Sequence, residues 1–531
     1  MPVRDHLLQI QRTLYDRFRT SAQQVGKLNP VLRKYFQEYQ REFTDYTEVC
    51  SRSELVQAFV ASEILVCGDY HTLPQAQRTA LRLLAEALEP LQAHGRTPVL
   101  ALEMLRTSDE AATAAYLAGT LKEAAFLEAI GFHKNWGFAW SNYRPLFEFA
   151  RENGIRIVGL SPSLGRKRPS LRERDKYAAK VLARQAEAHT DACFLVLMGD
   201  LHLAKGHLPA ELEKTAKRAL RVVVVHQNAE PLYWKLAEQG LEHQADAVRL
   251  RPGVYCVMNT PPWVKLQSYL RWVEWTADPD ASPDWDKAAY AEDFSEMVRT
   301  IQHFIGSAQA VEDGFEIRGP GEWSGIDRKA APAQKNFRKL LLRSVGSYYR
   351  PDTREVLLTS AGVNGAATQA AIYLHASLSR RWKQFTFPKQ DFYPTVWFEA
   401  LGFLGSKIIN PHRRCYGPSD FNDARKSDAL ARWVSNHVAE ERKTAFVGPE
   451  LPARPCAPER TVFFYRAARC LGQMLGAALY AAVAANKVKR EELLALFQEP
   501  FSDGKKARKA YLEWTRRLDG AGLRDVIRRE T

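Results

Sequence analysis

The tetrapeptide Gly-Asp-x-His occurs twice in this chain, and each copy follows a short apolar run. The first copy spans residues 68–71, after the run 63–67, and the second spans residues 199–202, after the run 193–198. Continuous apolar runs of this length are typical of parallel strands that are buried on both faces. Ligand sites of open parallel sheets lie just beyond the carboxyl ends of the strands, so the two motifs predict a site at one edge of a sheet. The simpler alternative is that Gly-Asp forms a turn and each histidine caps the helix that follows.

Further apolar runs alternate with helical patterns, which predicts an α/β fold with a largely parallel sheet flanked by helices. Strands are expected at 98–102, 155–159, 221–225 and 254–258, and the last of these is expected to close the sheet. Helices are expected at 74–92, 108–130, 143–153 and 172–189.

The pattern changes along the 531 residues, which are too many for one compact core. Residues 1–45 read as a helical segment, 46–275 as the α/β domain and 276–293 as an acidic, Pro-interrupted linker. Residues 294–531 read as a mainly α-helical C-terminal domain without a chemical motif. It is expected to hold a hairpin turn around 347–353 and helices near 362–380, 424–443, 459–486 and 489–518.

Composition limits which cellular compartment and which classes of binding partner are expected. The net charge is +14, but the basic clusters 166–168 and 505–509 are short, so we expect solvated surface rather than a nucleic-acid site. Seven cysteines without a Cys-x-x-Cys pair indicate a reducing compartment. The N-terminus has no apolar signal core, which predicts a cytoplasmic protein. The uncharged run 470–486 contains Gly472-x-x-x-Gly476 but is shorter than the ~20 residues of a membrane span, so we expect a buried helix.

Polar side chains directly follow the predicted strands. His71, Glu103 and His202 together form a ligand set suited to zinc, manganese or iron. Asp69 or Asp200 would then orient a histidine or act as the general base on a metal-bound water. His226 also ends a strand, but the preceding valines suit a core histidine equally well.

A second group of candidates lies in the aromatic stretch 135–145. Trp136 and Phe138 can pack on the sheet edge or form the wall of a pocket for a flat, apolar ligand. Tyr143 and Arg144 have polar ends that need partners, and Arg144 is expected to pair with a ligand carboxylate.

Taken together, residues from about 60 to 275 resemble the ChaN-like family of the haem-binding-uptake (Tiki/TraB/erythromycin-esterase-like) superfamily. The resemblance rests on the two Gly-x-x-His motifs, the glutamate of Leu-Glu-Met at 102–104, Tyr-Leu-Ala-Gly at 116–119, Trp-Gly-Phe-x-Trp-x-x-Tyr-Arg-Pro at 136–145 and Gly-His-Leu-Pro at 206–209. Asp69 stands where the family usually has glutamate. A carboxylate base at this position would therefore lie on a side chain one methylene group shorter.

The resemblance implies a haem-binding or iron-related protein of bacterial type. Other branches of the superfamily imply a metal-dependent hydrolase, a peptidase or esterase, that uses the same residues. An interaction scaffold with a degenerate site is a third alternative, and self-association is left open. The expected cofactor is haem or a divalent metal, and the expected partner is haem or another small-molecule or peptide ligand. The expected ligand-binding residues are Gly68, Tyr70, Tyr143, Arg144, Gly199 and His207.

Overall fold

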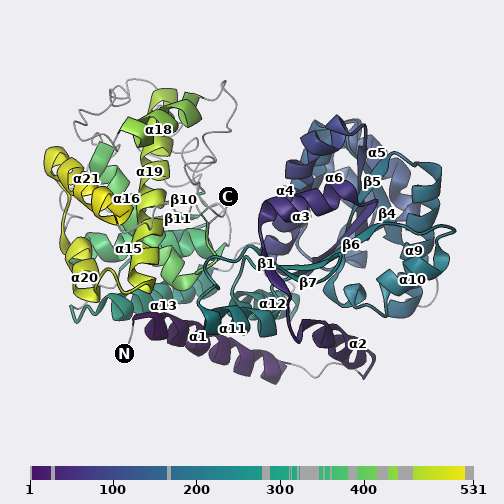
Figure 1. The fold of residues 1–531 in the computed structure, drawn as a ribbon, viewed down its shortest axis with the longest axis horizontal. Helices are drawn as coiled ribbons and strands as arrows, with labels where there is room; N and C mark the ends of the chain where they lie inside the picture. The colour runs from purple at the N-terminus through teal and green to yellow at the C-terminus, as the bar shows by residue number, and fades with distance from the viewer. Residues whose placement is uncertain are drawn as a thin grey trace. The chain divides into compact units, whose positions relative to one another are not determined.

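A computed structural model describes most of the chain in two compact units (Figure 1). Unit 1 comprises residues 1–14 and 284–531, and unit 2 comprises residues 15–283. The described residues are 3–25, 30–163, 169–277, 287–309, 311, 314–319, 322, 346–350, 353–358, 362–380, 392–414, 429–440 and 458–520. The basic cluster 166–168, residues 278–286 of the expected linker and both ends of the helix expected at 424–443 lie outside them. The domain boundaries stay a prediction.

Unit 2 is built on an eight-stranded sheet with the order β1-β7-β8-β6-β2-β5-β3-β4. The six strands from β8 to β4 in this order are parallel, which confirms the predicted fold class. Their bounds are Ile64–Asp69 (β2), Thr97–Arg106 (β3), Arg156–Ser161 (β4), Ala192–Gly199 (β5), Val222–Gln227 (β6) and Val254–Val257 (β8).

The expectation that the run 254–258 closes the sheet is wrong. Two further strands, β7 (Ala247–Arg251) and β1 (Glu48–Cys50), lie beyond β8, and both pair in the antiparallel direction. β7 leads into β8 through a tight turn at Pro252 and Gly253, where Gly253 has a φ of +74°. A positive φ favours glycine, and a short connection of this kind joins antiparallel neighbours.

Helices cover both faces of the sheet, so the unit has three layers. One face packs against α3 (Arg52–Ala61), α4 (Pro74–Ala93) and α8 (Trp140–Glu152). The edge strand β4 also contacts α9 (Leu171–Ala188), which packs on α10 (Leu208–Thr215) (Figure 1). The helix expected over 108–130 is interrupted at Gly119, which has a φ of +76°, and forms α5 (Glu110–Leu117) and α6 (Glu123–Ala129).

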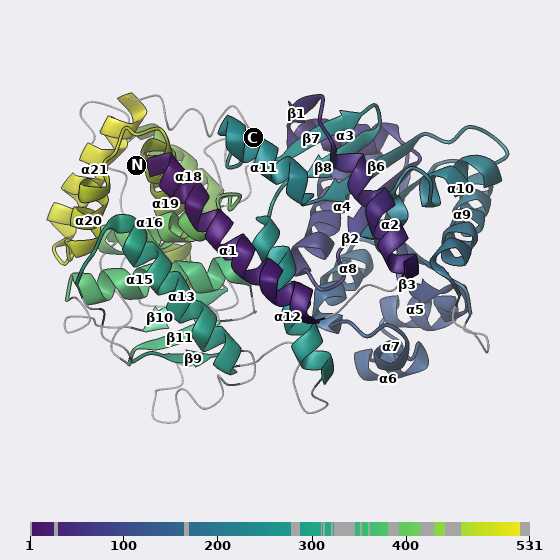
Figure 2. The same ribbon diagram turned by 90° about the horizontal axis from the view of Figure 1, so that it is seen from below.

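The strand order explains how distant residues meet. β5 lies between β2 and β3, so the carboxyl ends of these three parallel strands are neighbours. The motif 68–71 ends β2, and the motif 199–202 leads from β5 into the short turn η3 (Asp200–Leu203). Helix α2 (Pro30–Gln40) contacts η3, and α12 (Pro262–Ala277) follows β8. Figure 2 labels both helices. Helix α1 (Val3–Val25) has its first part in unit 1 and the rest in unit 2.

Unit 1 is mainly helical, as expected. Its helices are α13 (Lys287–Ile305), α15 (Val363–Leu378), α16 (Phe392–Ile409), α18 (Ala429–Glu440), α19 (Pro458–Ala484), α20 (Arg490–Gln498) and α21 (Gly504–Gly520). The predicted hairpin is confirmed by β10 (Ser347–Arg350) and β11 (Glu355–Leu358), which pair in the antiparallel direction, while β9 (Glu316–Arg318) adds to β11.

The Gly-x-x-x-Gly pattern lies where α19 packs on α16. A Cβ atom at Gly472 would lie 2.5 Å from the Val396 carbonyl oxygen, and one at Gly476 would overlap the Ala400 carbonyl oxygen. Small residues at this spacing therefore let the two helix backbones approach closely. Among the described helices, the stretch Phe463–Ala484 is long and apolar enough to cross a membrane, and 83% of its apolar window is buried. A core helix of a folded unit meets the same two criteria.

Candidate functional site

His71 is held by a carboxylate at the end of β2. Its Nδ1 atom donates to Asp69 Oδ2 over 2.8 Å, and the Tyr143 hydroxyl donates to the same oxygen over 2.8 Å. The Gln77 amide donates to the other oxygen of Asp69. Burial, with the Asp69 charge, holds the pKa of Tyr143 well above its usual value, so its hydroxyl stays a donor. A proton on Nδ1 leaves the His71 Nε2 lone pair free to bind a ligand.

His202, at the end of β5, has a matching arrangement. Its Nδ1 atom lies 2.5 Å from Asp175 Oδ1, and the Tyr35 hydroxyl donates to Asp175 Oδ2 over 3.2 Å. Burial lowers the pKa of His202, and the Asp175 carboxylate opposes that shift. Burial alone would raise the pKa of Asp175, but hydrogen bonds from His202 and His207 hold it below its ordinary value. At neutral pH the pair therefore consists of an ionised aspartate and a neutral imidazole.

Asp175 and Arg174 come from the first turns of α9, and we did not predict either of them. Ser170 caps this helix by accepting from the Glu173 backbone N–H, and Glu173 returns a bond to the Ser170 backbone N–H. This capping box fixes where the helix begins and thereby places Arg174 and Asp175 at the site. The capping box is readable from the sequence, but nothing in the sequence shows that the next turn faces the strand ends.

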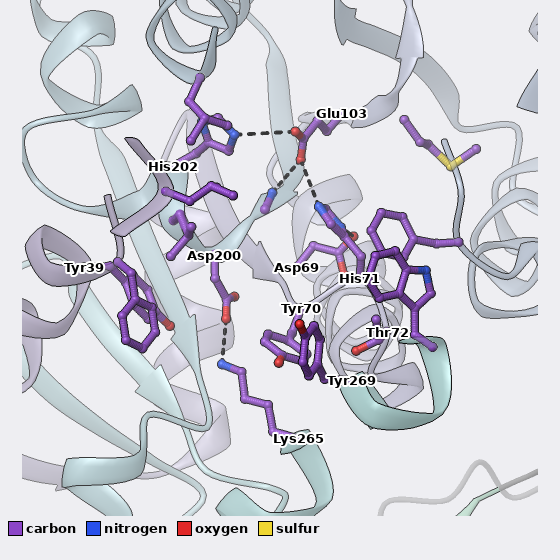
Figure 3. Close-up of a pocket in the computed structure, with 18 of the residues that line it drawn as sticks. Tyr39, Asp69, Tyr70, His71, Thr72, Glu103, Asp200, His202, Lys265 and Tyr269 are labelled. Atoms are coloured by element: carbon purple, nitrogen blue, oxygen red, sulfur yellow. Dashed lines mark hydrogen bonds and ion pairs between the residues drawn. The ribbon is translucent and has the colours of Figure 1, made fainter. Parts of the chain in front are cut away.

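Glu103 lies between the two histidines (Figure 3). Its Oε2 atom is 3.8 Å from His71 Nε2, and its Oε1 atom is 3.6 Å from His202 Nε2. It accepts from the Gly199 backbone N–H over 2.6 Å and forms an ion pair with Arg174. Glu103 does not follow its strand as predicted, because β3 continues to Arg106 through an irregularity between residues 102 and 106. Bulges of this kind redirect side chains near functional sites.

The glycine of each motif leaves room for a neighbouring side chain. A Cβ atom at Gly199 would lie 3.1 Å from His71 Nε2, 3.3 Å from Glu103 Oε2 and 3.4 Å from the His202 ring. A Cβ atom at Gly68 would lie 2.6 Å from Asp200 Oδ1. A side chain at Gly199 would therefore intrude directly between the two histidines.

Asp200 forms an ion pair with a lysine from outside the motif. Its Oδ2 atom lies 2.7 Å from the Lys265 ammonium on α12, and that ammonium is 4.4 Å from the centre of the Tyr70 ring (Figure 3). Burial, with the Asp200 charge, raises the pKa of Tyr70. Asp69 is likewise occupied by its three partners. Each of the two carboxylates considered as a general base thus already has a partner, and Lys265 is a further site residue that we did not predict.

The site opens into a cavity of about 730 Å³, which is within the usual range of small-molecule pockets. Aromatic rings line it next to His71: the Trp136 and Phe138 ring centres are 4.8 and 4.7 Å from the imidazole centre. Phe138 in turn stacks on Trp272, whose indole N–H donates to the Gly137 carbonyl oxygen. The site therefore combines a polar end at the strand termini with apolar, aromatic walls.

The predicted residues divide into three groups. Those at the cavity wall are Asp69, Tyr70, His71, Glu103, Gly199, Asp200 and His202. Tyr143, Gly68 and His207 lie behind that wall, where His207 Nε2 is 2.7 Å from Glu38 Oε2 and Nδ1 is 3.6 Å from Asp175 Oδ2. Arg144 lies elsewhere, because it pairs with Glu123 on the surface rather than facing the cavity.

The histidines and carboxylates do not form a compact metal site. Within the described residues, no three His, Cys, Asp or Glu side chains are arranged to hold a metal ion. The Arg174 guanidinium forms an ion pair with the Glu103 carboxylate and balances its negative charge.

His226, the other histidine at a strand end, is a core residue. It is fully buried between Tyr39 and Phe43, and its ring nitrogens have no hydrogen-bond partner among the described residues. Its pKa is lowered to about 3, mainly by burial and also by the positive charges of Arg251 and Lys265.

This histidine should make unit 2 sensitive to acid. Between the unfolded pKa of 6.5 and the folded pKa of about 3, the unfolded chain binds a proton that the folded chain does not, so stability falls as the pH falls through this window. His226→Leu should flatten the dependence and, by removing buried unpaired nitrogens, stabilise the unit by about 1–3 kcal/mol at pH 7. Urea unfolding from pH 4 to 7 measures both effects. The exposed His94→Leu is the control, and an unchanged pH dependence in His226→Leu would contradict the assignment.

Comparisons with known proteins agree with part of the sequence interpretation. The family described as haem-binding uptake, Tiki superfamily, ChaN matches residues 55–168. Two solved structures align with part of the chain. One is described as cofacial heme binding to ChaN of Campylobacter jejuni, with 14% identity, a TM-score of 0.28, and coverage of 34% of this chain and 86% of that one. The other is the type III effector HopBA1, with 19% identity, a TM-score of 0.24, and coverage of 35% and 88%. No curated protein matches the sequence.

Proposed function

From the match of residues 55–168 to the ChaN family of haem-binding uptake proteins, we propose that unit 2 binds haem in the cavity at the strand ends. His71 would supply an axial ligand. The observation that carries this proposal is the presentation of His71, which lies at the wall of an aromatic cavity and has 21% of its side chain exposed. Its Nδ1 atom is held by Asp69, so the free Nε2 atom is the one available to iron.

The cavity suits the shape and chemistry of a porphyrin. Trp136, Phe138 and Trp272 provide flat apolar surface beside the imidazole. Planar apolar ligands gain most of their binding energy from such contacts, while a few polar groups fix their orientation. Here those groups are the ion pairs of Arg174 with Glu103 and of Lys265 with Asp200.

The Asp69–His71 pair would tune a bound haem. A carboxylate that accepts from the second nitrogen of an imidazole increases the basicity of the coordinating nitrogen and fixes the orientation of the ring. Haem would supply the iron, whereas Asp69, Tyr143 and Gln77 would hold the ligand in place.

Titration with haemin tests the proposal. The wild-type chain should give a saturable shift of the Soret band, and His71→Ala should weaken binding by about 100-fold or more because it removes the ligand itself. Tyr143→Phe should weaken it by about tenfold, since it removes only support for Asp69. The control is His94→Ala, because His94 is exposed and lies just beyond the C-terminal end of α4, whereas His71 precedes its N-terminal end. This variant should bind haemin as the wild type does. No saturable shift, or equal binding by His71→Ala, would contradict the proposal.

A metal-dependent hydrolase is the second candidate. The observation that favours it is that both histidine Nε2 atoms face the Glu103 carboxylate. Zinc, manganese or iron would have to displace the Arg174 guanidinium from Glu103 to bind there. Elemental analysis decides between the two. Stoichiometric metal that is lost in His71→Ala and in His202→Ala, without a haemin shift, would favour the hydrolase. Neither haem nor metal would favour an interaction scaffold.

A further inference from the structure

Helix α2 lies outside the family-matched region and forms part of the cavity wall. Leu32, Phe36 and Tyr39 of this helix line the cavity. We propose that α2 is a movable cover of the site, and that Asp175 is a positioning residue that joins the docking of this cover to the orientation of His202. The part of the proposal that concerns haem rests on the proposed function.

Polar contacts of Tyr35 and Glu38 fasten α2 to the site. The Tyr35 hydroxyl donates to Asp175 Oδ2 over 3.2 Å, and Glu38 Oε2 lies 2.7 Å from His207 Nε2. The Tyr35 ring also packs on the His207 ring, with 3.9 Å between their centres. Tyr35 is buried, whereas Phe36 beside it is 38% exposed. The helix is thus anchored by the polar contacts of Tyr35 and Glu38, and its neighbouring side chains Leu32, Phe36 and Tyr39 contribute to the cavity wall.

Asp175 connects these contacts to the centre of the site. One of its carboxylate oxygens holds His202 Nδ1 at 2.5 Å, and the other accepts from Tyr35 and lies 3.6 Å from His207. If α2 moves away, Asp175 loses the Tyr35 hydrogen bond, and His207 loses Glu38. Because Asp175 is the group that fixes the ring of His202, displacement of the helix weakens the restraint on that imidazole.

The His71 arrangement offers an internal control. Asp69 is supported by Tyr143 from α8 and by Gln77 from α4, and neither of these residues belongs to α2. The two aspartates therefore have the same relation to their histidines, but only Asp175 contacts the cover. A substitution at Asp175 should loosen α2, and the equivalent substitution at Asp69 should not.

Amide hydrogen exchange of the ligand-free full chain tests this coupling without haem. Asp175→Asn and the double variant Tyr35→Phe/Glu38→Gln should raise exchange in residues 30–40 by about tenfold, as expected for the loss of hydrogen bonds to a charged group. Exchange in α4 should not change. Two controls should leave the exchange of residues 30–40 unchanged. One is Asp69→Asn in β2, and the other is Gln37→Ala at an exposed position of α2. Unchanged exchange in Asp175→Asn, or an equal rise in Asp69→Asn, would overturn the proposal.

Haemin kinetics test the role as a cover. In Tyr35→Phe/Glu38→Gln, haemin should enter and leave the protein several-fold faster than in the wild type, and the absorption spectrum of the complex should be the same. Equal rates in the two proteins would show that α2 does not cover the entrance. If the wild type binds no haemin, the proposed function fails, and the exchange experiment still decides whether Asp175 holds α2.

Discussion

Gly199→Val is expected to weaken haemin binding by about 10- to 100-fold while unit 2 remains folded. The Gly199 backbone has φ −49° and ψ 136°, which valine tolerates, so no backbone strain is added. Its Cβ atom, however, would lie 3.1 Å from His71 Nε2 and 3.3 Å from Glu103 Oε2. Overpacking at such a position costs about 1–3 kcal/mol, and here the cost falls on the group that is proposed to bind iron.

Haemin titration, with circular dichroism to confirm the fold, measures this effect. Gly199→Ala should bind with intermediate affinity, because its single methyl group requires shifts of a few tenths of an ångström. Gly206→Val is the matched control, since a Cβ atom there meets nothing within 4 Å. Wild-type affinity in folded Gly199→Val would show that the ligand does not use the space between the two histidines.

Gly476→Val is expected to destabilise unit 1 by about 3 kcal/mol, because α19 and α16 can no longer approach closely. A Cβ atom at this position would overlap the Ala400 carbonyl oxygen and lie 3.1 Å from the Leu404 backbone nitrogen. The obstacle is backbone, which cannot move aside as a flexible side chain can. Separating the helices would also open a gap along buried side chains of both.

The loss of stability is measured by thermal or urea unfolding, with protease cleavage within residues 284–531 as the signal that unit 1 has unfolded. Arg466→Val, at an exposed position of the same helix, controls for the lower helix propensity of valine and should cost less than about 1 kcal/mol. Equal stability of the Gly476→Val and Arg466→Val chains would show that the glycine is not required for packing of α19 on α16.

The parallel core of unit 2 was predictable because its strands are buried on both faces and read as continuous apolar runs. The antiparallel strands were missed for the opposite reason. β1 has three residues, of which only Cys50 is buried, and β7 alternates alanine, valine and leucine with Arg249 and Arg251. Short strands with charged side chains are typical of sheet edges and resemble loops in composition.

The site was predictable where it depended on strand ends. The order of β2, β5 and β3 brings together His71, His202 and Glu103, which the sequence separates by up to 131 positions (202 − 71). Their proposed roles, the cytoplasmic location and self-association stay predictions. Arg144 was placed at the site on its chemistry alone, and a nearby Glu123 satisfies it instead.

Asp175 and Lys265 could not be found in the same way. Both lie on helices, where charged side chains are common and usually face solvent. Their importance depends on which face of each helix meets the strand ends, and that is decided by tertiary packing. The apolar wall from α2 and α12 was missed for the same reason.

Imidazole rescue of His71→Gly tests the central claim most directly. The variant removes the proposed axial ligand and leaves a space where free imidazole can bind to the iron. We predict that His71→Gly binds haemin weakly and that added imidazole restores the wild-type absorption spectrum, whereas Gly199→Val is not restored. A His71→Gly chain that binds haemin with the wild-type spectrum and affinity, with no response to imidazole, would contradict the account.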